Sequence, residues 1–147
     1  MRLVLQRVSS ASVAVDGRNV GAIGRGYLIL LCVLKGDTSL QAQWLAEKVT
    51  KLRLFDAPDG KVNDRSVLDI GGGILVVSQF TLAGDTAKGN RPDYTAAADP
   101  GEAKILYEYF LKKLKELGVT KVAGGEFGAM MEVQLVNDGP VTLVLEK

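Results

Sequence analysis

A run of polar side chains directly follows the apolar segment 74–77, and its residue types are suited to acyl-transfer chemistry. Ser78 and Thr81 carry hydroxyls that could act as nucleophiles, and Gln79 carries an amide that could stabilise an oxyanion. No turn residue separates this run from the apolar segment, so we expect one strand over 74–81. Polar residues also end strands because strand ends meet water, so both interpretations stay open at this point.

The chain contains no histidine, and this absence limits the mechanisms that are open to it. Ser-His-Asp and Cys-His activation of a nucleophile are excluded, and so are metal sites built on histidine. No Ser-x-x-Lys spacing supplies a lysine base in their place. A hydroxyl nucleophile in this chain would therefore lack an activating base.

Asn137-Asp138-Gly139-Pro140 combines four residue types that favour turns. It predicts a turn between one strand in 127–136 and a second in 141–147. A proline directly before a strand gives up a ladder donor, which makes Pro140 an unusual choice there. Its peptide isomer cannot be read from the sequence.

Segment 83–100 shows no periodicity, and loops of this length are usually functional or disordered. Within it, Lys88 and Arg91 could clamp a phosphate. They could equally be charged loop residues that keep the surface in water.

Composition predicts a soluble globular chain of one domain, with 47% hydrophobic and 24% charged residues among 147. The net charge of +1 disfavours a protein that grips long duplex nucleic acid. The sequence has no run of 18 apolar residues, so no membrane span is expected. The start of the chain does not resemble a signal peptide. The one cysteine, Cys32, lies in an apolar run and is expected to be a buried structural thiol.

The elements that must position the polar residues alternate between strands and helices. We expect strands over 2–8 and 26–34, and between them a hairpin that turns at Asp16-Gly17. A first helix is predicted from Thr38, with Gln41 completing a capping box. Its apolar stripe, expected to be buried, is Leu40, Trp44, Leu45, Val49 and Leu52.

A second helix is predicted to begin at Asp99-Pro100 and to end at Gly118. Its expected buried face is Leu106, Phe110, Leu111 and Leu114. With two main helices and mostly antiparallel strands, the predicted fold class is α+β.

Two segments taken together, VVSQFTL at 76–82 and LVNDGPVT at 135–142, resemble the D-aminoacyl-tRNA deacylase family. QRV at 6–8, GNRPDY at 89–94 and FGAMMEV at 127–133 follow in the expected order, so the resemblance covers the whole chain. One departure is Cys32, where family members often have glycine.

The resemblance implies a single deacylase-like domain over 1–147 that forms a cytoplasmic homodimer. Its implied reaction is hydrolysis of the ester that joins a D-amino acid, or glycine on a non-cognate tRNA, to the 3′ end of tRNA. L-aminoacyl-tRNA is rejected. The implied partner is the acceptor end of aminoacyl-tRNA, and neither a cofactor, a metal nor a membrane is implied.

The resemblance also implies roles for particular residues. The implied catalytic residues are Ser78, Gln79, Phe80 and Thr81, with backbone N–H groups near Phe80 and Thr81 binding the oxyanion. The implied substrate-binding residues are Gly139, Pro140, Asn137, Arg7 and Met130, and those implied to contact tRNA are Lys88 and Arg91. The cis Gly139-Pro140 pair would reach into the pocket of the partner subunit and crowd the place of an L side chain.

This chemistry needs no histidine, because the 2′-hydroxyl of the terminal ribose could activate water or carry the proton. Thr81 as a nucleophile is the alternative mechanism. Two alternative functions also remain: a nucleic-acid-binding module with this fold, and a related deacylase that removes L-alanine. The second would be expected to depart from the family pattern at Ser78 or Phe80, and neither residue does.

Overall fold

The first predicted strand continues without a break into the hairpin that follows it. In the computed structural model, which describes residues 1–147, β1 runs over Arg2–Val15 and pairs with three other strands. Its first half lies beside β3 (Gly26–Cys32), and its second half beside β2 (Arg18–Ile23), on the same side. Its other side is covered along the whole length by β8 (Met131–Glu146). β1 is therefore the central strand of the sheet.

The sheet continues beyond β3 with parallel strands. β6 (Gly73–Ser78) pairs in parallel with β3, and β7 (Lys121–Gly124) pairs in parallel with β6. The strand order is β2-β1-β3-β6-β7, with β8 on the other side of β1. The short strands β4 (Arg53–Phe55) and β5 (Arg65–Ser66) form a separate hairpin. Antiparallel pairs predominate as predicted, whereas the two parallel pairs and β7 were not predicted.

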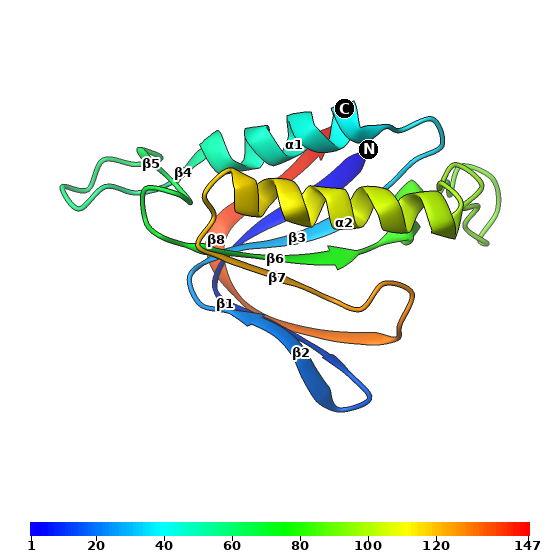
Figure 1. Ribbon diagram of the computed structural model, residues 1–147, viewed down its shortest axis with the longest axis horizontal. Coiled ribbons are helices and arrows are strands. Elements are labelled where there is room, and N and C mark those ends of the chain that lie inside the picture. The colour runs from blue at the N-terminus through cyan, green and yellow to red at the C-terminus, as the bar shows by residue number, and fades with distance from the viewer.

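Two helices cover one face of the sheet (Figure 1). Helix α1 (Ser39–Lys51) begins at Thr38, whose side chain and that of Gln41 form the predicted capping box. Helix α2 (Pro100–Glu116) begins after Asp99 with proline in its first turn. The predicted α+β class with two main helices is confirmed.

The predicted buried stripe of α1 is confirmed at Leu45 and Val49 and wrong at Leu40 and Trp44. Leu40 is 75% exposed and Trp44 is 40% exposed. Ala42, Ala46 and Thr50 are buried beside the two confirmed residues, so small side chains make up the rest of the face that packs on the sheet. Alanines let α1 approach the sheet closely, while Trp44 lies at the surface beneath the ammonium groups of Lys48 and Lys147.

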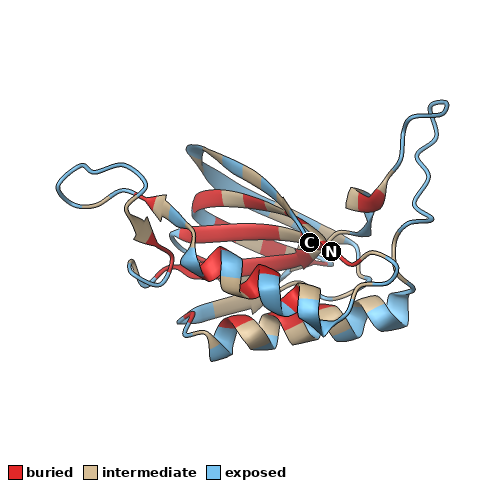
Figure 2. Ribbon diagram, turned by 90° about the horizontal axis from the view of Figure 1, so that it is seen from above, coloured by how far each residue is buried: buried red, intermediate tan, exposed pale blue.

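The main core lies between the helices and the sheet, where buried residues line the inner side of both helices (Figure 2). A smaller core on the opposite face joins the curled β1–β2 hairpin to β3 and β6. On α2, Phe110 and Leu114 are buried as predicted. Tyr107 is buried beside them, and burial raises the pKa of its hydroxyl to about 12.

The Tyr107 hydroxyl donates to the Val76 carbonyl at 2.9 Å, and the Gly125 carbonyl lies within hydrogen-bonding distance of the same hydroxyl at 3.2 Å. This bond fixes α2 to β6 two residues before Ser78. Because β3 and β6 are parallel, their carboxyl ends meet at one edge of the sheet. The polar run that follows β6 therefore leaves the sheet from a rigid support.

Candidate active site

The polar run leaves the sheet earlier than predicted. β6 ends at Ser78, which pairs with Leu31, and Gln79 makes the last contact by donating its N–H to the Leu31 carbonyl at 2.8 Å. The chain then turns into a single 3₁₀ turn, η1 (Phe80–Ala83). The predicted strand over 74–81 is thus wrong for its last three residues.

The carbonyl groups of the η1 turn point toward donors within the protein. Gln79 O accepts from Leu82 N at 3.2 Å, and Thr81 O accepts from Gly84 N at 3.0 Å. Phe80 O lies 3.6 Å from the Cys32 thiol, which burial keeps protonated by raising its pKa. Since peptide units are planar, bonds to these carbonyls also set the direction of the following N–H groups.

The N–H groups of Phe80 and Thr81 precede the first hydrogen bond of the turn, which Leu82 N donates, and neither takes part in the turn, loop and cap bonds of the backbone. The first N–H groups of any helical turn lack partners inside the turn. Here no side chain caps them, and both residues are exposed. Two free donors at an exposed turn can bind an oxygen that gains negative charge.

The side chains of the turn do not activate a nucleophile. The Gln79 Nε2 group donates to the Thr81 hydroxyl oxygen at 2.5 Å, and an amide cannot accept the hydroxyl proton through that nitrogen. The Phe80 ring is 59% exposed and meets the edge of Tyr94 at 5.3 Å between ring centroids. The sequence reasoning did not single out Tyr94, although it lies in the quoted GNRPDY segment.

Gly139-Pro140 does not form a turn between two strands. It lies inside β8, where the register against β1 shifts opposite Arg7, and its peptide bond is cis. A single bent strand therefore replaces the predicted pair. The turn residues between segments 127–136 and 141–147 give the sequence the pattern of two separate strands.

Arg7 holds this bend from the neighbouring strand. It is 8% exposed and donates from Nε to the Asp138 carbonyl at 2.9 Å and from Nη2 to the Gly139 carbonyl at 3.2 Å. Its Nη1 donates to the Leu54 carbonyl at 2.5 Å. Gly139 and Pro140 themselves stay exposed, so the bend is fixed from below and open above.

Gln6 makes a second set of contacts beside the bend. Its side-chain amide donates to the Asn137 side-chain oxygen and accepts from the Thr142 hydroxyl, the latter at 2.8 Å. Gln6 links the residues on both sides of Gly139-Pro140 across the strand pair. It was not selected from the sequence, although it begins the quoted QRV segment.

The two motifs are not brought together within one chain. The η1 turn lies beyond the Arg2 end of β1, and the Gly139-Pro140 bend lies at Arg7, about 16 Å further along the strand at 3.3 Å per residue. They also lie on opposite sides of β1, because β3 and β6 flank one side and β8 the other. Met130 lies near neither motif: it is 89% exposed and precedes the end of β8 that pairs with Val15.

Lys88 and Arg91 are exposed residues of the loop that follows η1, which Figure 1 shows in green to yellow-green. The base of this loop is closed by reciprocal backbone bonds between Asp85 and Asp93. An open depression of about 570 Å³, lined by residues 91–95, lies along it. The contact between Tyr94 and Phe80 joins this surface to the η1 turn. Lys88 and Arg91 lie on that surface without contacting the turn themselves.

No group of three or more potential ligands is arranged to hold a metal ion. No helix has both the length and the apolar character needed to cross a bilayer.

The sequence of the chain matches a known protein family. A family model described as D-Tyr-tRNA(Tyr) deacylase matches residues 4–146. A protein of Geotalea uraniireducens named D-aminoacyl-tRNA deacylase is 58% identical over 146 residues, covering 99% of this chain and 93% of that protein. A protein of Roseiflexus castenholzii with the same name is also 58% identical, covering 99% and 92%.

Two solved structures share the fold of this chain. The structure of a protein named c-Myc DNA Unwinding Element Binding Protein superposes with a TM-score of 0.94 at 41% identity, covering 100% of this chain and 99% of that one. A second, of a probable eukaryotic D-amino acid tRNA deacylase, has a TM-score of 0.85 at 18% identity and supports the fold alone, covering 98% and 97%. With a model match over nearly its full length and relatives at this identity, the chain belongs to the D-Tyr-tRNA(Tyr) deacylase family.

Proposed function

We propose that this chain hydrolyses the ester between a D-amino acid and the 3′ end of tRNA, and the ester of glycyl-tRNA, while sparing L-aminoacyl-tRNA. The products are the free amino acid and tRNA. The observation that carries the proposal is the pair of unbonded N–H groups of Phe80 and Thr81 at an exposed turn. In a family whose relatives are named D-aminoacyl-tRNA deacylases, such donors suit the oxyanion of ester hydrolysis.

In the proposed reaction, water attacks the ester carbonyl carbon and the carbonyl oxygen becomes negative. The N–H groups of Phe80 and Thr81 stabilise that oxygen, and the bond from carbon to the ribose 3′-oxygen then breaks. The 2′-hydroxyl of the same ribose relays a proton from the water to the leaving 3′-oxygen. The chain contains no histidine, and the Thr81 hydroxyl is bonded to an amide, which supports a mechanism without a side-chain base.

We propose that chirality is read by Gly139-Pro140 from a second copy of the chain. The separation of about 16 Å between the two motifs along β1 supports an active site completed by a partner. β8 has β1 on one side and no strand on the other. Several apolar residues in or next to it are exposed, namely Met130, Leu135, Val136 and Val144. A long, apolar edge strand of this kind favours association.

In such a dimer, the Gly139 and Pro140 backbone would face the substrate α-carbon. Their carbonyls could accept from its ammonium group, and rigid backbone would fill the place of an L side chain. Asn137 and Arg7 would hold this wall in position through the contacts described above. Met130, remote from both motifs within one chain, would reach a pocket only through the partner.

Lys88, Arg91 and the lysines of α2 are proposed to contact the acceptor end of the tRNA. The loop that carries Lys88 and Arg91 begins directly after η1, so phosphates next to the ester would pass close to it. A net charge of +1 fits a protein that grips only this short end. The expected compartment is the cytoplasm, where charged tRNA is used.

The decisive experiment compares the loss of ester from D-Tyr-tRNA, Gly-tRNA and L-Tyr-tRNA at equal enzyme concentration. We expect rapid loss from the first two and none above background from the third. Equal rates on the D and L esters would refute chiral selection. Two further measurements test the mechanism and the dimer.

The mechanism is tested with the variant Thr81→Ala and with tRNA that ends in 2′-deoxyadenosine. We expect Thr81→Ala to keep much of its activity, whereas the deoxy substrate should react very slowly. A removed nucleophile would instead lower kcat by orders of magnitude. Normal turnover of the deoxy substrate together with an inactive Thr81→Ala would assign the chemistry to Thr81.

The dimer is tested by measuring the mass of the active protein by light scattering. We expect twice the mass of one chain. A fully active preparation at the mass of a single chain would contradict completion of the site by a partner.

One solved structure motivates a second candidate function. The protein that is 41% identical is named for binding a DNA unwinding element. A DNA-binding module would need a basic face, whereas this chain carries 18 basic and 17 acidic residues. Tight binding of duplex DNA near physiological salt, without turnover of D-Tyr-tRNA, would favour that function over the deacylase.

A further inference from the structure

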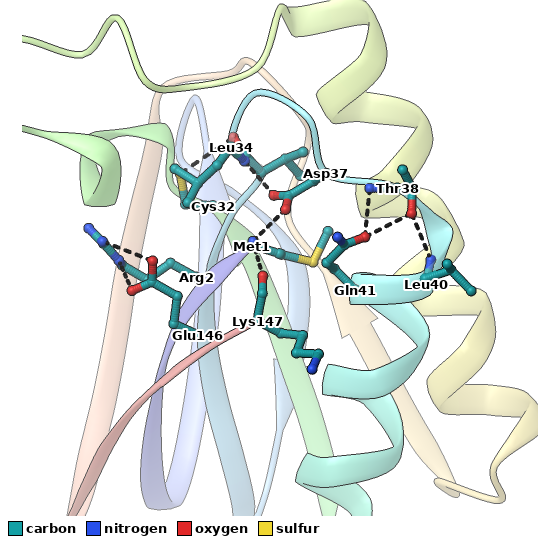
Figure 3. Close-up of polar contacts among 11 residues, drawn as sticks. Met1, Arg2, Cys32, Leu34, Asp37, Thr38, Leu40, Gln41, Glu146 and Lys147 are labelled. Atoms are coloured by element: carbon teal, nitrogen blue, oxygen red, sulfur yellow. Dashed lines mark hydrogen bonds and ion pairs between the residues drawn. The ribbon is translucent and has the colours of Figure 1, made fainter.

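Arg2, the first residue of β1, makes three directed contacts at the edge of the sheet that bears the η1 turn. Its Nε donates to Glu146 Oε2 at 2.9 Å and its Nη2 to Glu146 Oε1 at 3.2 Å, so the two side chains form a bidentate pair (Figure 3). Its Nη1 donates to the Leu82 carbonyl at 2.7 Å. One side chain thereby connects β1, the end of β8 and the η1 turn.

The Leu82 carbonyl lies where an external donor is needed. The last carbonyls of a helical turn have no partner inside it. The carbonyls of Gln79 and Thr81 are bonded within the turn, and the Phe80 carbonyl faces the Cys32 thiol. Arg2 supplies the donor for the next carbonyl, so consecutive peptide planes of the turn are all fixed.

The pair with Glu146 determines which way the remaining donor points. A guanidinium group is planar and rigid, and a carboxylate bound in the bidentate manner fixes its orientation. With Nε and Nη2 held by Glu146, Nη1 is directed at Leu82. A lysine ammonium in this place could not satisfy both partners with the same geometry.

Such a pair would be expected to add little to global stability. The side chains of Arg2 and Glu146 are 35% and 50% exposed, and exposed ion pairs are screened by water. The third contact differs, because its acceptor is backbone in a half-buried residue of the turn. The effect of Arg2 should therefore be local to the turn.

We propose that Arg2 is a positioning residue for the reaction: by holding the Leu82 carbonyl it fixes the far end of the η1 turn, and through the bonded peptide planes before Leu82 it keeps the N–H groups of Phe80 and Thr81 aimed at the substrate oxygen. Glu146 acts through Arg2 by orienting its guanidinium group. This inference rests on the proposed deacylase function. β1 then carries one arginine for each motif, Arg2 for the turn and Arg7 for the bend.

The kinetic test uses Arg2→Met, which keeps the length of the side chain and removes its donors. We expect kcat for D-Tyr-tRNA to fall about tenfold, with KM changed less than about twofold, since the contact orients the oxyanion donors rather than the ground-state substrate. Arg2→Lys, which keeps one charged donor, should recover part of that loss. Glu146→Gln should cost about threefold, and Arg2→Met combined with Glu146→Gln should be no worse than Arg2→Met alone.

The matched control is Arg18→Met, which removes another exposed arginine paired with a glutamate, Glu126, at 3.4 Å. That pair joins β2 to the segment after β7 and makes no contact with η1. We expect kcat to be unchanged. A tenfold loss in this control would show that the Arg2 effect reflects a general loss of surface charge, and it would overturn the proposal.

Hydrogen exchange supplies a readout that does not depend on activity. In Arg2→Met, amides within 79–84 should exchange at least about fivefold faster, with the rest of the sheet unchanged, because a local opening is made easier. Unchanged exchange in this segment, or wild-type kcat in Arg2→Met, would overturn the positioning role. Faster exchange in a protein whose wild type does not deacylate D-Tyr-tRNA would support the positioning role and refute the deacylase function.

Discussion

The two ends of the first half of β1 hold their motifs in different ways. At one end Arg7 is 8% exposed, and all three of its nitrogens donate to backbone carbonyls. At the other end Arg2 is more exposed and directs two donors to a carboxylate and one to a carbonyl. The exposed bend at Gly139-Pro140 is thus held from below by a buried side chain, whereas the η1 turn is held by a more exposed one. A wall that excludes the wrong enantiomer, which is the role proposed for this bend, would benefit from the first arrangement.

Removal of the Arg7 side chain should have the largest effect on the stability of the protein. In Arg7→Met, three carbonyls lose their donor in a buried place, and we expect the free energy of unfolding to fall by about 2–4 kcal/mol. Urea denaturation measures this. Arg7→Lys should lose less, because it keeps the charge and one donor, and it remains available if Arg7→Met does not fold. A change below about 1 kcal/mol in Arg7→Met would mean that the bend does not depend on this side chain.

At the same bend, Gly139→Ala should lower activity without lowering stability. An added Cβ would meet only the Asn137 side-chain nitrogen, at 3.0 Å, and the residue is exposed. We therefore expect unfolding to change by less than about 0.5 kcal/mol, while deacylation of D-Tyr-tRNA falls at least about tenfold because backbone can no longer approach the substrate. Gly101→Ala, with open space around its Cβ, is the control and should keep its activity. Full activity in Gly139→Ala would remove this bend from the pocket.

Cys32→Ala should have a moderate effect at the η1 end. It removes the thiol that faces the Phe80 carbonyl, and we expect a loss of about 1 kcal/mol of stability and about a twofold lower kcat. Cys32→Ser keeps a donor and should restore kcat. If serine and alanine behave alike, the thiol acts by packing and not by its hydrogen bond.

The smallest expected effect concerns pH. The hydrogen bond from Arg2 lowers the pKa of Glu146 below its ordinary 4.5, so the folded state favours the ionised carboxylate. The contribution of the pair is full above pH 4.5 and is lost as pH falls through the lower folded value. Exchange within 79–84, measured relative to Glu146→Gln, should therefore accelerate only in acid. At the bend, Arg7 keeps three carbonyl contacts that do not titrate beside its 3.3 Å contact with the Asp138 carboxylate, so exchange there should change less in acid than in the turn. An equal change at both ends would erase the difference between them.

The sequence predicted the local features of this fold well and the long-range ones poorly. The capping box at Thr38 and the start of α2 depend on neighbours within one turn, and both were predicted. The bend in β8 was predicted to be a turn between two strands. The strand is continuous because β8 pairs with β1, which lies more than a hundred residues earlier in the sequence.

Two further differences have physical causes. Phe80 and Thr81 favour strands by propensity, so the end of β6 at Ser78 was missed; hydrogen bonds within the turn outweigh that preference. Trp44 was predicted to lie in the core because it is a large apolar residue at helical spacing. In the structure α1 packs closely on the sheet, and alanines occupy part of its buried face. Arg2 gave no signal at all, since its partners lie 80 and 144 residues away.

The pairing of β1 with β8 also determines when in folding the η1 turn becomes ordered. More than a hundred residues separate β1 from β8, and bringing such distant segments together costs entropy. Proteins dominated by contacts of this kind fold slowly. On a ribosome, β1, β3 and β6 can assemble while Glu146 is still inside the exit tunnel, so Arg2 has no partner to orient it. The donors of Phe80 and Thr81 would then acquire their final direction last, after β8 has joined the sheet. A nascent chain should therefore be a folded scaffold before it is a catalyst.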